Sequence, residues 1–391
     1  YILAHSEHHL VHDGWSFNTF LHELLVLYRA FMHNQPSPLP DLPVQFVDFV
    51  HWQRQLAASD MAREQLAYWT ERLAGSPSLL QLPTDHPRGN IQTFRGEALR
   101  IELPPELCEQ LRACCRREGC TLYMAMLAGF FTLLYRYTEQ EDICLGTGIA
   151  NRRSRDAEQL IGMIINTLVL RTDLSGNPTF RDLLARVREE TLGAYEHQDI
   201  PFEKVVEVLR PERNLSYNPF FQVIFGFHDS PLDSLELPDL ELTLEEGLSN
   251  GSAKFDLNLI VIPRSEQAMD ARQRMRDTGI TMVWEYNTDL FEHATIERMI
   301  AAYQMLLENL CSDAAQRIAD VPLLTARERE RQLIEWNATA LVSADNGYLY
   351  QLIEARAHLA PEAIAIEYRG ERISYRGLNE RANHWRITCA A

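Results

Sequence analysis

The stretch HSEHHLVHDGWS, residues 5–16, holds four histidines, two acids and a glycine within twelve positions. Imidazole titrates near neutral pH, so a histidine here could accept and return a proton or hydrogen-bond a nucleophile. Asp13 could hold the turn or pair with a distant basic residue, and Gly14 leaves space where a substrate must pass. The sequence contains no G-x-S-x-G nucleophile signature. The pattern therefore favours direct attack of one substrate on another, assisted by a single histidine.

Two other interpretations of these histidines stay open at this point. His8 and His9 could bind zinc, but neighbours in a predicted strand point to opposite faces and chelate poorly. A histidine can also be a structural residue of the core or the surface. Cys114, Cys115 and Cys120 form the closest cysteine group, but two of them fall in a helical pattern with no histidine near. We expect no metal site.

Composition excludes several classes of function. The 391 residues carry 37 Lys and Arg against 55 Asp and Glu, a net charge of −18, with no basic cluster to suggest nucleic-acid binding. No uncharged apolar run reaches the length of a membrane span. Seven cysteines without paired spacing fit a reducing cytoplasm, where we expect the protein to act. The first residues show no signal peptide and look like the interior of a domain.

The elements that must position the histidines follow from periodicity. Residues 1–11 predict a strand, and apolar residues at three- and four-residue spacing predict a helix after it, capped by Ser16. A second helix is predicted over 46–73, and the turn formers of 82–90 indicate a linker.

The rest of the chain predicts alternating helices and strands. Gly119 and Thr121 should end one helix and cap the next. The expected strands are 97–104, 142–150, 164–174, 220–228, 255–263 and 279–287. The expected helices are 105–119, 122–137, 180–198 and 294–311, followed by a polar connector and a final helix-strand-strand-helix unit.

Several motifs in a fixed order resemble one family. HHLVHDG (8–14) is similar to the HHxxxDG signature of condensation domains of nonribosomal peptide synthetases. The resemblance continues for about 330 residues, through FVDFVHWQ (46–53), LPTDHPR (82–88), IGMIINTLVLR (161–171), HQDIPFE (197–203), RNLSYNPFFQV (213–223), KFDLNL (254–259) and EYNTDLF (285–291). In addition, ISYRGLNERAN (373–383) resembles the first core motif of an adenylation domain.

The resemblance implies an α/β (α+β) fold of two chloramphenicol-acetyltransferase-like lobes that form a V-shaped pseudo-dimer, with the first lobe truncated at its N-terminus. We expect such a fragment to have little or no activity alone. The implied order is the remainder of the N-terminal lobe (1–81), an inter-lobe linker (82–95), the C-terminal lobe (96–320), a connector (321–345) and a truncated start of an adenylation domain (346–391).

The resemblance also implies an activity. Such domains join a carrier-bound acyl or peptidyl thioester to the amine of a carrier-bound aminoacyl thioester. His9 would take a proton from the attacking amine or, as we prefer, orient it. His8 would support the loop, Asp13 would be a structural anchor and Gly14 would leave room for the substrate. A family arginine that pairs with such an aspartate is missing, and Arg171 is the candidate in its place.

Further residues are assigned by the same resemblance. Trp15, Ser16 and Asn218 are expected to line the substrate tunnel, although Ser16 as a helix cap and Asn218 as a turn residue are alternatives. His197 and Asp199 are expected to support the interface between the lobes.

The implied partners are the upstream and downstream peptidyl carrier domains and the adjacent adenylation domain, without nucleic acid or membrane. No cofactor is expected to bind directly, because the substrates arrive on phosphopantetheine arms of the carriers. Two alternatives remain: epimerisation or another acyl transfer on the same fold, and a non-catalytic platform that docks carrier proteins.

Overall fold

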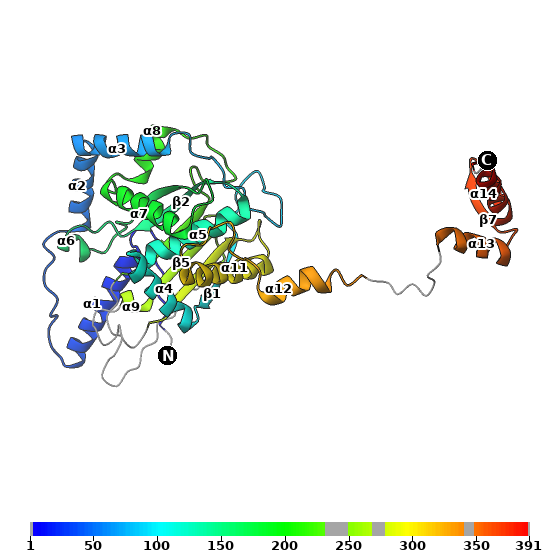
Figure 1. Cartoon of the computed structure of the whole chain (residues 1–391). Coiled ribbons are helices and arrows are strands. Elements are labelled where there is room, and N and C mark those ends of the chain that lie inside the picture. The colour runs from blue at the N-terminus through cyan, green and yellow to red at the C-terminus, as the bar shows by residue number, and fades with distance from the viewer. Residues whose placement is uncertain (1–2, 231–248, 268–277, 340–347, 390–391) are drawn as a thin grey trace. The chain divides into compact units, whose positions relative to one another are not determined.

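The computed structural model describes residues 3–230, 249–267, 278–339 and 348–389 (Figure 1). The chain divides into two compact units, Tyr1–Thr325 and Ala326–Ala391. The histidine turn and the large sheet belong to the first unit.

Three helices precede the sheet of the first unit: α1 Gly14–Met32, α2 Phe46–Ala57 and α3 Asp60–Leu73. The predicted strand over 1–11 is wrong for the described part, since residues 3–8 have no regular structure and 9–11 form a turn. None of the described strands pairs with this segment, and a strand without a neighbour leaves its ladder unmade.

The boundaries of these helices also differ from the prediction. Asp13 caps α1, because its carboxylate accepts a hydrogen bond from the Ser16 backbone N–H, and Ser16 already lies within the helix. The predicted helix over 46–73 is two helices. Ser59 begins the second by accepting a hydrogen bond from the backbone N–H of Ala62, and this local N-cap competes with continuation of α2.

The sheet of the first unit is mixed and has six strands in the order β1-β6-β5-β4-β2-β3. Its strands are β1 Gly96–Glu102, β2 Asp142–Ile149, β3 Asn166–Asp173, β4 Val223–Phe227, β5 Leu257–Pro263 and β6 Ile280–Asn287. The β2–β4 and β4–β5 pairs are parallel, and the other three are antiparallel. The six strands predicted after residue 90 are present with end residues that differ by up to three positions, and the predicted α/β class is confirmed.

The remaining helices among the described residues of this unit are α4 Pro105–Glu118, α5 Leu122–Thr138, α6 Arg155–Glu158, α7 Phe180–Glu196, α8 Phe202–Leu209, α9 Arg264–Gln267 and α11 His293–Ser312. Thr121 caps α5, and Gly119 ends α4 in the left-handed conformation, as predicted. α5 packs against α4, α7 and α11.

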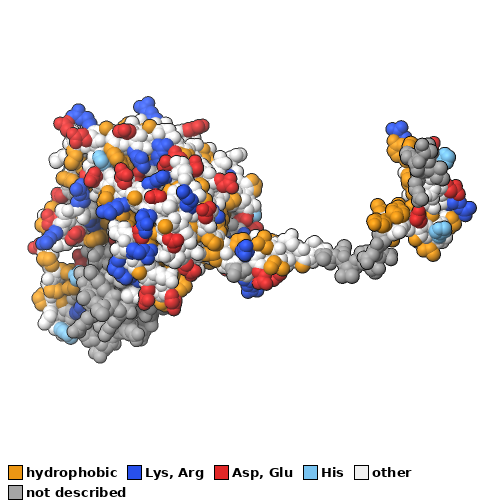
Figure 2. All heavy atoms as spheres, viewed as in Figure 1, with side chains coloured by type: hydrophobic (Ala, Val, Ile, Leu, Met, Phe, Trp, Pro, Cys, Tyr) orange, Lys and Arg blue, Asp and Glu red, His pale blue; other side chains and the backbone are white. Residues whose placement is uncertain are grey.

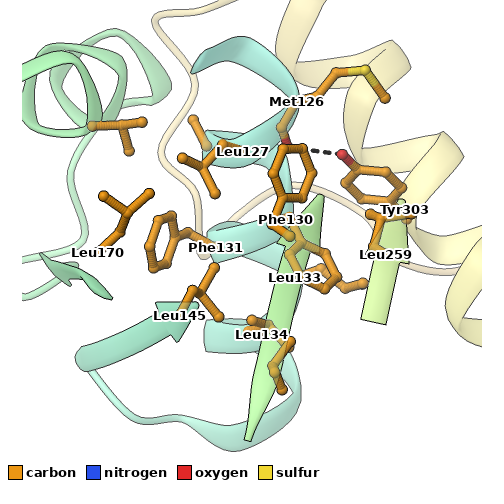
Figure 3. Close-up of a cluster of buried hydrophobic side chains, with 14 of the residues drawn as sticks. Met126, Leu127, Phe130, Phe131, Leu133, Leu134, Leu145, Leu170, Leu259 and Tyr303 are labelled. Carbon is orange, nitrogen blue, oxygen red and sulfur yellow. Dashed lines mark hydrogen bonds between the residues drawn. The ribbon is translucent and has the colours of Figure 1, made fainter. Parts of the chain in front are cut away.

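The core lies where α5 meets the sheet (Figure 3). Phe130, Phe131 and Leu134 of α5 are fully buried with Leu145 of β2 and Leu170 of β3. The Tyr303 hydroxyl of α11 donates a hydrogen bond of 2.7 Å to the Met126 carbonyl, so this polar group is satisfied within the core. α5 therefore acts as the central element on which the sheet and the neighbouring helices are assembled.

The second unit consists of α12 Ala326–Glu330, a π-helical turn Arg331–Glu335, α13 Leu349–Leu359, β7 Ile364–Tyr368, β8 Glu371–Ser374 and α14 Tyr375–Cys389. β7 and β8 form an antiparallel pair, which gives the predicted helix-strand-strand-helix order. Among its described side chains, Ala357 is the one buried hydrophobic residue. This unit therefore has little core of its own.

On the face of the first unit in Figure 2, acidic and basic side chains are interspersed. No single helix of the described residues is long and apolar enough to cross a membrane. The bent pair α4 and α5 passes such a test only when the two are taken together, and α5 is largely buried in the core.

Candidate active site

The two adjacent histidines lie in the turn that precedes α1. The Val11 N–H donates to the His8 carbonyl at 3.0 Å, and the Leu10 N–H donates to His8 Nδ1 at 3.1 Å. His8 thus holds the turn with both its backbone and its ring. His9 is exposed, with its ring centroid 5.7 Å from that of His12.

Other titratable groups surround this turn. Glu7 Oε1 lies 3.1 Å from both His5 Nε2 and His12 Nδ1. Burial lowers the pKa of His12, with Glu7 acting in the opposite direction. The His5 ring stacks on Phe20 of α1, with centroids 4.6 Å apart, so the segment before the turn is tied to the helix after it.

Asp13 is the anchor of the turn. It is 2% exposed, and each carboxylate oxygen accepts several hydrogen bonds. Oδ1 accepts from the Ser16 N–H at 2.9 Å and the Ser16 hydroxyl at 2.8 Å, and Oδ2 accepts from the N–H groups of Ile164 and Ile165 at 2.9 and 3.1 Å. A carboxylate so occupied is poorly placed to act as a base on a substrate.

Arg152 supplies the charge opposite Asp13. Its two terminal nitrogens donate to Oδ2 at 2.9 Å and to Oδ1 at 2.8 Å, a bidentate pair with the arginine side chain 1% exposed. Burial alone would raise the pKa of Asp13, but the hydrogen bonds and charge of Arg152, together with Ser16, lower it below the ordinary value. The carboxylate therefore stays ionised at neutral pH.

Ser16 extends this network to a second loop. Its oxygen accepts hydrogen bonds from the Gly162 N–H and from Arg152, both at 3.0 Å, and lies 3.0 Å from the Gly162 carbonyl. Ser16 is 1% exposed, so it lies behind the turn rather than along a surface. Trp15 is half-buried, donates from Nε1 to the Glu158 carbonyl at 2.8 Å, and lies beside the Arg152 guanidinium.

Gly14 differs from Gly162, the glycine of the loop that Ser16 contacts. A Cβ added to Gly14 meets nothing within 4 Å, and its backbone does not require glycine. A Cβ added to Gly162 would lie 2.3 Å from Phe46 Cδ2. Packing explains the glycine at 162, whereas none of the residues that the structure describes requires the one at 14.

The prediction that Arg171 pairs with Asp13 is wrong. Arg171 on β3 forms its ion pair with Asp142 of β2, at 2.7 Å, and donates to the carbonyls of Arg72 and Ala74 at the end of α3. Asp142 and Arg171 project from neighbouring antiparallel strands two positions out of register, which suits a diagonal cross-strand pair. Arg171 thus ties α3 to the sheet.

Three further predicted residues make contacts away from the turn. The Asn218 amide donates to the Lys254 carbonyl at 2.9 Å, a contact between two loops. His197 stacks on Tyr68 of α3, with centroids 3.8 Å apart, and its carbonyl accepts from Trp69 Nε1. Asp199 is buried and accepts from Arg153 and from Gln65 of α3.

The structure thus brings together Asp13, Ser16 and Trp15 next to the histidine turn and adds Arg152, which the sequence analysis missed. The sequence feature that could have indicated Arg152 is the pair of arginines at 152 and 153, which follows the buried strand predicted over 142–150. Among the described residues, no group of three or more His, Cys, Asp or Glu side chains is arranged to hold a metal ion.

Comparison with known proteins places this site in a family. The condensation-domain family model matches residues 1–333. The chain belongs to the condensation-domain family. It is also 42% identical over 377 residues to one of the linear gramicidin synthase subunits of Brevibacillus parabrevis, a match that covers 96% of this chain and 7% of that protein. This condensation domain therefore corresponds to a small part of the curated relative.

Solved structures agree on the fold. The X-domain from teicoplanin biosynthesis, in its complex with OxyB, matches with a TM-score of 0.70 and 27% identity over 81% of this chain and 69% of the other. A four-domain nonribosomal peptide synthetase bound to AMP and glycine matches with a TM-score of 0.78 and 21% identity over 97% of this chain and 29% of the other. The second likeness extends beyond the condensation domain into residues of the second unit.

Proposed function

We propose that this condensation domain forms peptide bonds in nonribosomal peptide synthesis. It would join a carrier-bound acyl or peptidyl thioester to the amine of a carrier-bound aminoacyl thioester. Family membership and identity to part of a gramicidin synthase support the proposal. The observation that carries it is the buried Asp13–Arg152 pair, which anchors the turn on which His9 is exposed.

The reaction needs a positioned amine more than a strong base. The acceptor nitrogen attacks the thioester carbonyl, the C–N bond forms, and the C–S bond breaks as the donor thiol leaves with the proton released by the amine. A neutral imidazole offers one acceptor nitrogen, which can hold an amine N–H and direct the lone pair at the carbonyl. We assign this orienting role to His9, with proton transfer as its second role. Asp13 acts only through the turn.

The open space at Gly14 supports substrate approach beside His9. Gly14 is the first residue of α1, directly after the anchor Asp13, and its added Cβ would point into open space. Because no contact among the described residues requires this glycine, we assign it to the passage of a substrate. Trp15 and Asn218 remain proposed tunnel residues, whereas the burial of Ser16 favours its role in the network behind the turn.

The carriers and the next domain are part of the proposal. The substrates would arrive on phosphopantetheine arms of upstream and downstream peptidyl carrier domains, with no cofactor held by this chain. We also propose that residues 346–391 begin an adenylation domain. Support comes from the motif at 373–383 and from the fold likeness to a four-domain synthetase over 97% of the chain.

A docking platform is the second candidate, and one observation favours it. The X-domain that resembles this fold is described in complex with OxyB, so a protein of this fold can hold a partner. Incubation of the domain, in its natural multidomain context, with donor- and acceptor-loaded carriers separates the two functions. The proposal expects the acceptor carrier to gain the mass of the donor acyl group. Binding of both carriers without this transfer would instead support the platform.

A further inference from the structure

Two cysteines meet where α4 ends. Gly119 adopts the left-handed conformation with φ 65°, and the Cys120 N–H donates to the Cys115 carbonyl at 3.1 Å. This backbone hydrogen bond belongs to a common helix C-cap, in which the side chain after the glycine contacts a side chain of the last helical turn. At this cap both of these side chains are thiols, so the backbone geometry places Cys115 and Cys120 next to each other.

Cys120 is the accessible member of this pair. It is partly exposed, whereas Cys115 is 8% exposed. Cys120 lines an open pocket of about 470 Å³ between the end of α4 and α7. Its charged lining residues are Arg117, Glu118, Arg181, Arg188 and Glu189.

The pocket is locally cationic in a strongly acidic chain. Its three arginines outnumber its two glutamates, although the net charge of the chain is −18. Glu118 is occupied by Arg117 and Arg181 at 3.0 and 2.7 Å. Arg188 donates one N–H to the Gly119 carbonyl, next to Cys120, and its guanidinium carries five such donors. A small ligand with carboxylates suits this rim.

We propose that Cys120 and Cys115 form a reversible redox site that reacts with small anionic disulfides of the glutathione type. The Cys120 thiolate attacks one sulfur of the disulfide, whose S–S bond breaks and releases one thiolate. Cys115 then attacks the Cys120 sulfur, the Cys115–Cys120 bond forms, and the second small thiolate leaves. The protein loses two electrons and two protons, and the small disulfide becomes two thiols.

The assignment of attacking and resolving thiol follows from position. Cys120 faces the pocket, and the hydrogen bond from Cys115 lowers the pKa of Cys120, which favours the thiolate that reacts. Cys115 lies behind it and reaches only the mixed disulfide on Cys120. Two other cysteines, Cys114 and Cys311, are 0% and 3% exposed, so they provide an internal comparison of buried thiols.

Peptide mapping of the whole chain tests the site directly. The native protein is incubated with glutathione disulfide, remaining thiols are alkylated under denaturing conditions, and trypsin is added without reduction. Cleavage after Arg112, Arg116 and Arg117 separates Cys115 from Cys120. The proposal expects these two peptides to be linked, and the link to disappear on return to reduced glutathione. Full alkylation of both cysteines after oxidation overturns it.

Variants assign each thiol. Cys115→Ser should stop at a glutathione adduct on Cys120, Cys120→Ser should lose both adduct and link, and Cys114→Ser should keep the link. A link that survives Cys115→Ser but not Cys114→Ser would overturn the assignment.

Arg188→Gln should slow the reaction with glutathione disulfide severalfold but not that with neutral hydroxyethyl disulfide. If the native protein and Arg188→Gln reacted with glutathione disulfide at equal rates, the proposal that the ligand is anionic would be wrong.

Discussion

At the scale of single residues, the side chain proposed to contact the substrate is exposed, whereas the side chains that hold it in place are buried. His9 is exposed on a turn, while Asp13 behind it is buried and has its carboxylate occupied by Arg152, Ser16 and two backbone N–H groups. A buried carboxylate with this many donors stabilises a conformation. The two proposed roles, contact with the substrate for His9 and support of the turn for Asp13, follow from this difference in burial.

Asp13→Asn should destabilise the domain strongly. The substitution leaves Arg152 buried opposite a neutral group, which costs about 3–5 kcal/mol of unfolding free energy. Denaturant unfolding at pH 7 measures the loss, and exposed Asp41→Asn serves as the matched control. An Asp13→Asn protein as stable as the control would contradict the anchoring role.

The same ion pair predicts a pH dependence. The folded pKa of Asp13 lies below its ordinary value of 3.8, so its contribution to stability is fully present above that value. The contribution is lost as the pH falls through the lower folded pKa. The stability difference between native protein and Asp13→Asn, followed by unfolding from pH 7 to pH 2, should therefore shrink below about pH 3.8. A constant difference would contradict the pKa direction.

Gly14→Ala should separate activity from stability. The added methyl group meets no atom of the described residues within 4 Å, so the thermal midpoint should stay unchanged or rise slightly. Condensation should slow, because the methyl group occupies substrate space. Gly162→Ala is the structural comparison, because its Cβ collides with Phe46 and should cost about 1–3 kcal/mol. Full activity of Gly14→Ala would remove the argument that substrate passes there.

At the scale of elements, α3 connects the N-terminal helices to the sheet, in addition to the contacts of Asp13 and Ser16 at the start of α1. Its Gln65, Tyr68 and Trp69 contact the segment 197–199, and Arg171 reaches the carbonyls at its C-terminal end. Gln65 both donates to Asp199 and accepts from its backbone N–H. These contacts fix α3, and they join residues far apart in the chain.

Gln65→Ala should weaken this connection. It leaves the buried Asp199 with one fewer donor and its N–H without its acceptor, a loss of about 1–3 kcal/mol. Gln55→Ala on exposed α2 should change stability by about 0.5 kcal/mol or less. Chemical denaturation of both variants measures the difference, and equal stability would show that the Gln65–Asp199 contact does not hold α3.

The elements also show which features the sequence predicts. The caps at Gly119 and Thr121 depend on donors and acceptors within a few residues, so local patterns predicted them correctly. The strand over 1–11 failed because alternation indicates a strand only where a neighbouring strand completes the ladder. Arg152 was missed because it lies 139 positions from Asp13, and only the folded chain brings them together.

At the scale of the whole molecule, the two units differ in how much they bury. The first unit holds the large core around α5, whereas the described part of the second buries the single hydrophobic residue Ala357. Amide protection depends on such burial. Backbone amides of α13 should therefore exchange with deuterium far faster than those of α5, as mass spectrometry can follow. Equal protection of the two helices would contradict a weakly packed second unit.

We propose that His9, held by the Asp13–Arg152 anchor, carries peptide-bond formation. The most direct measurement is a single-turnover assay with donor- and acceptor-loaded carrier proteins, comparing His9→Ala with the native domain in its natural multidomain context. We expect amide-linked product from the native protein and loss of product from His9→Ala, with both carriers still bound. Equal product from the two proteins would contradict it, and so would carrier binding by native protein without product.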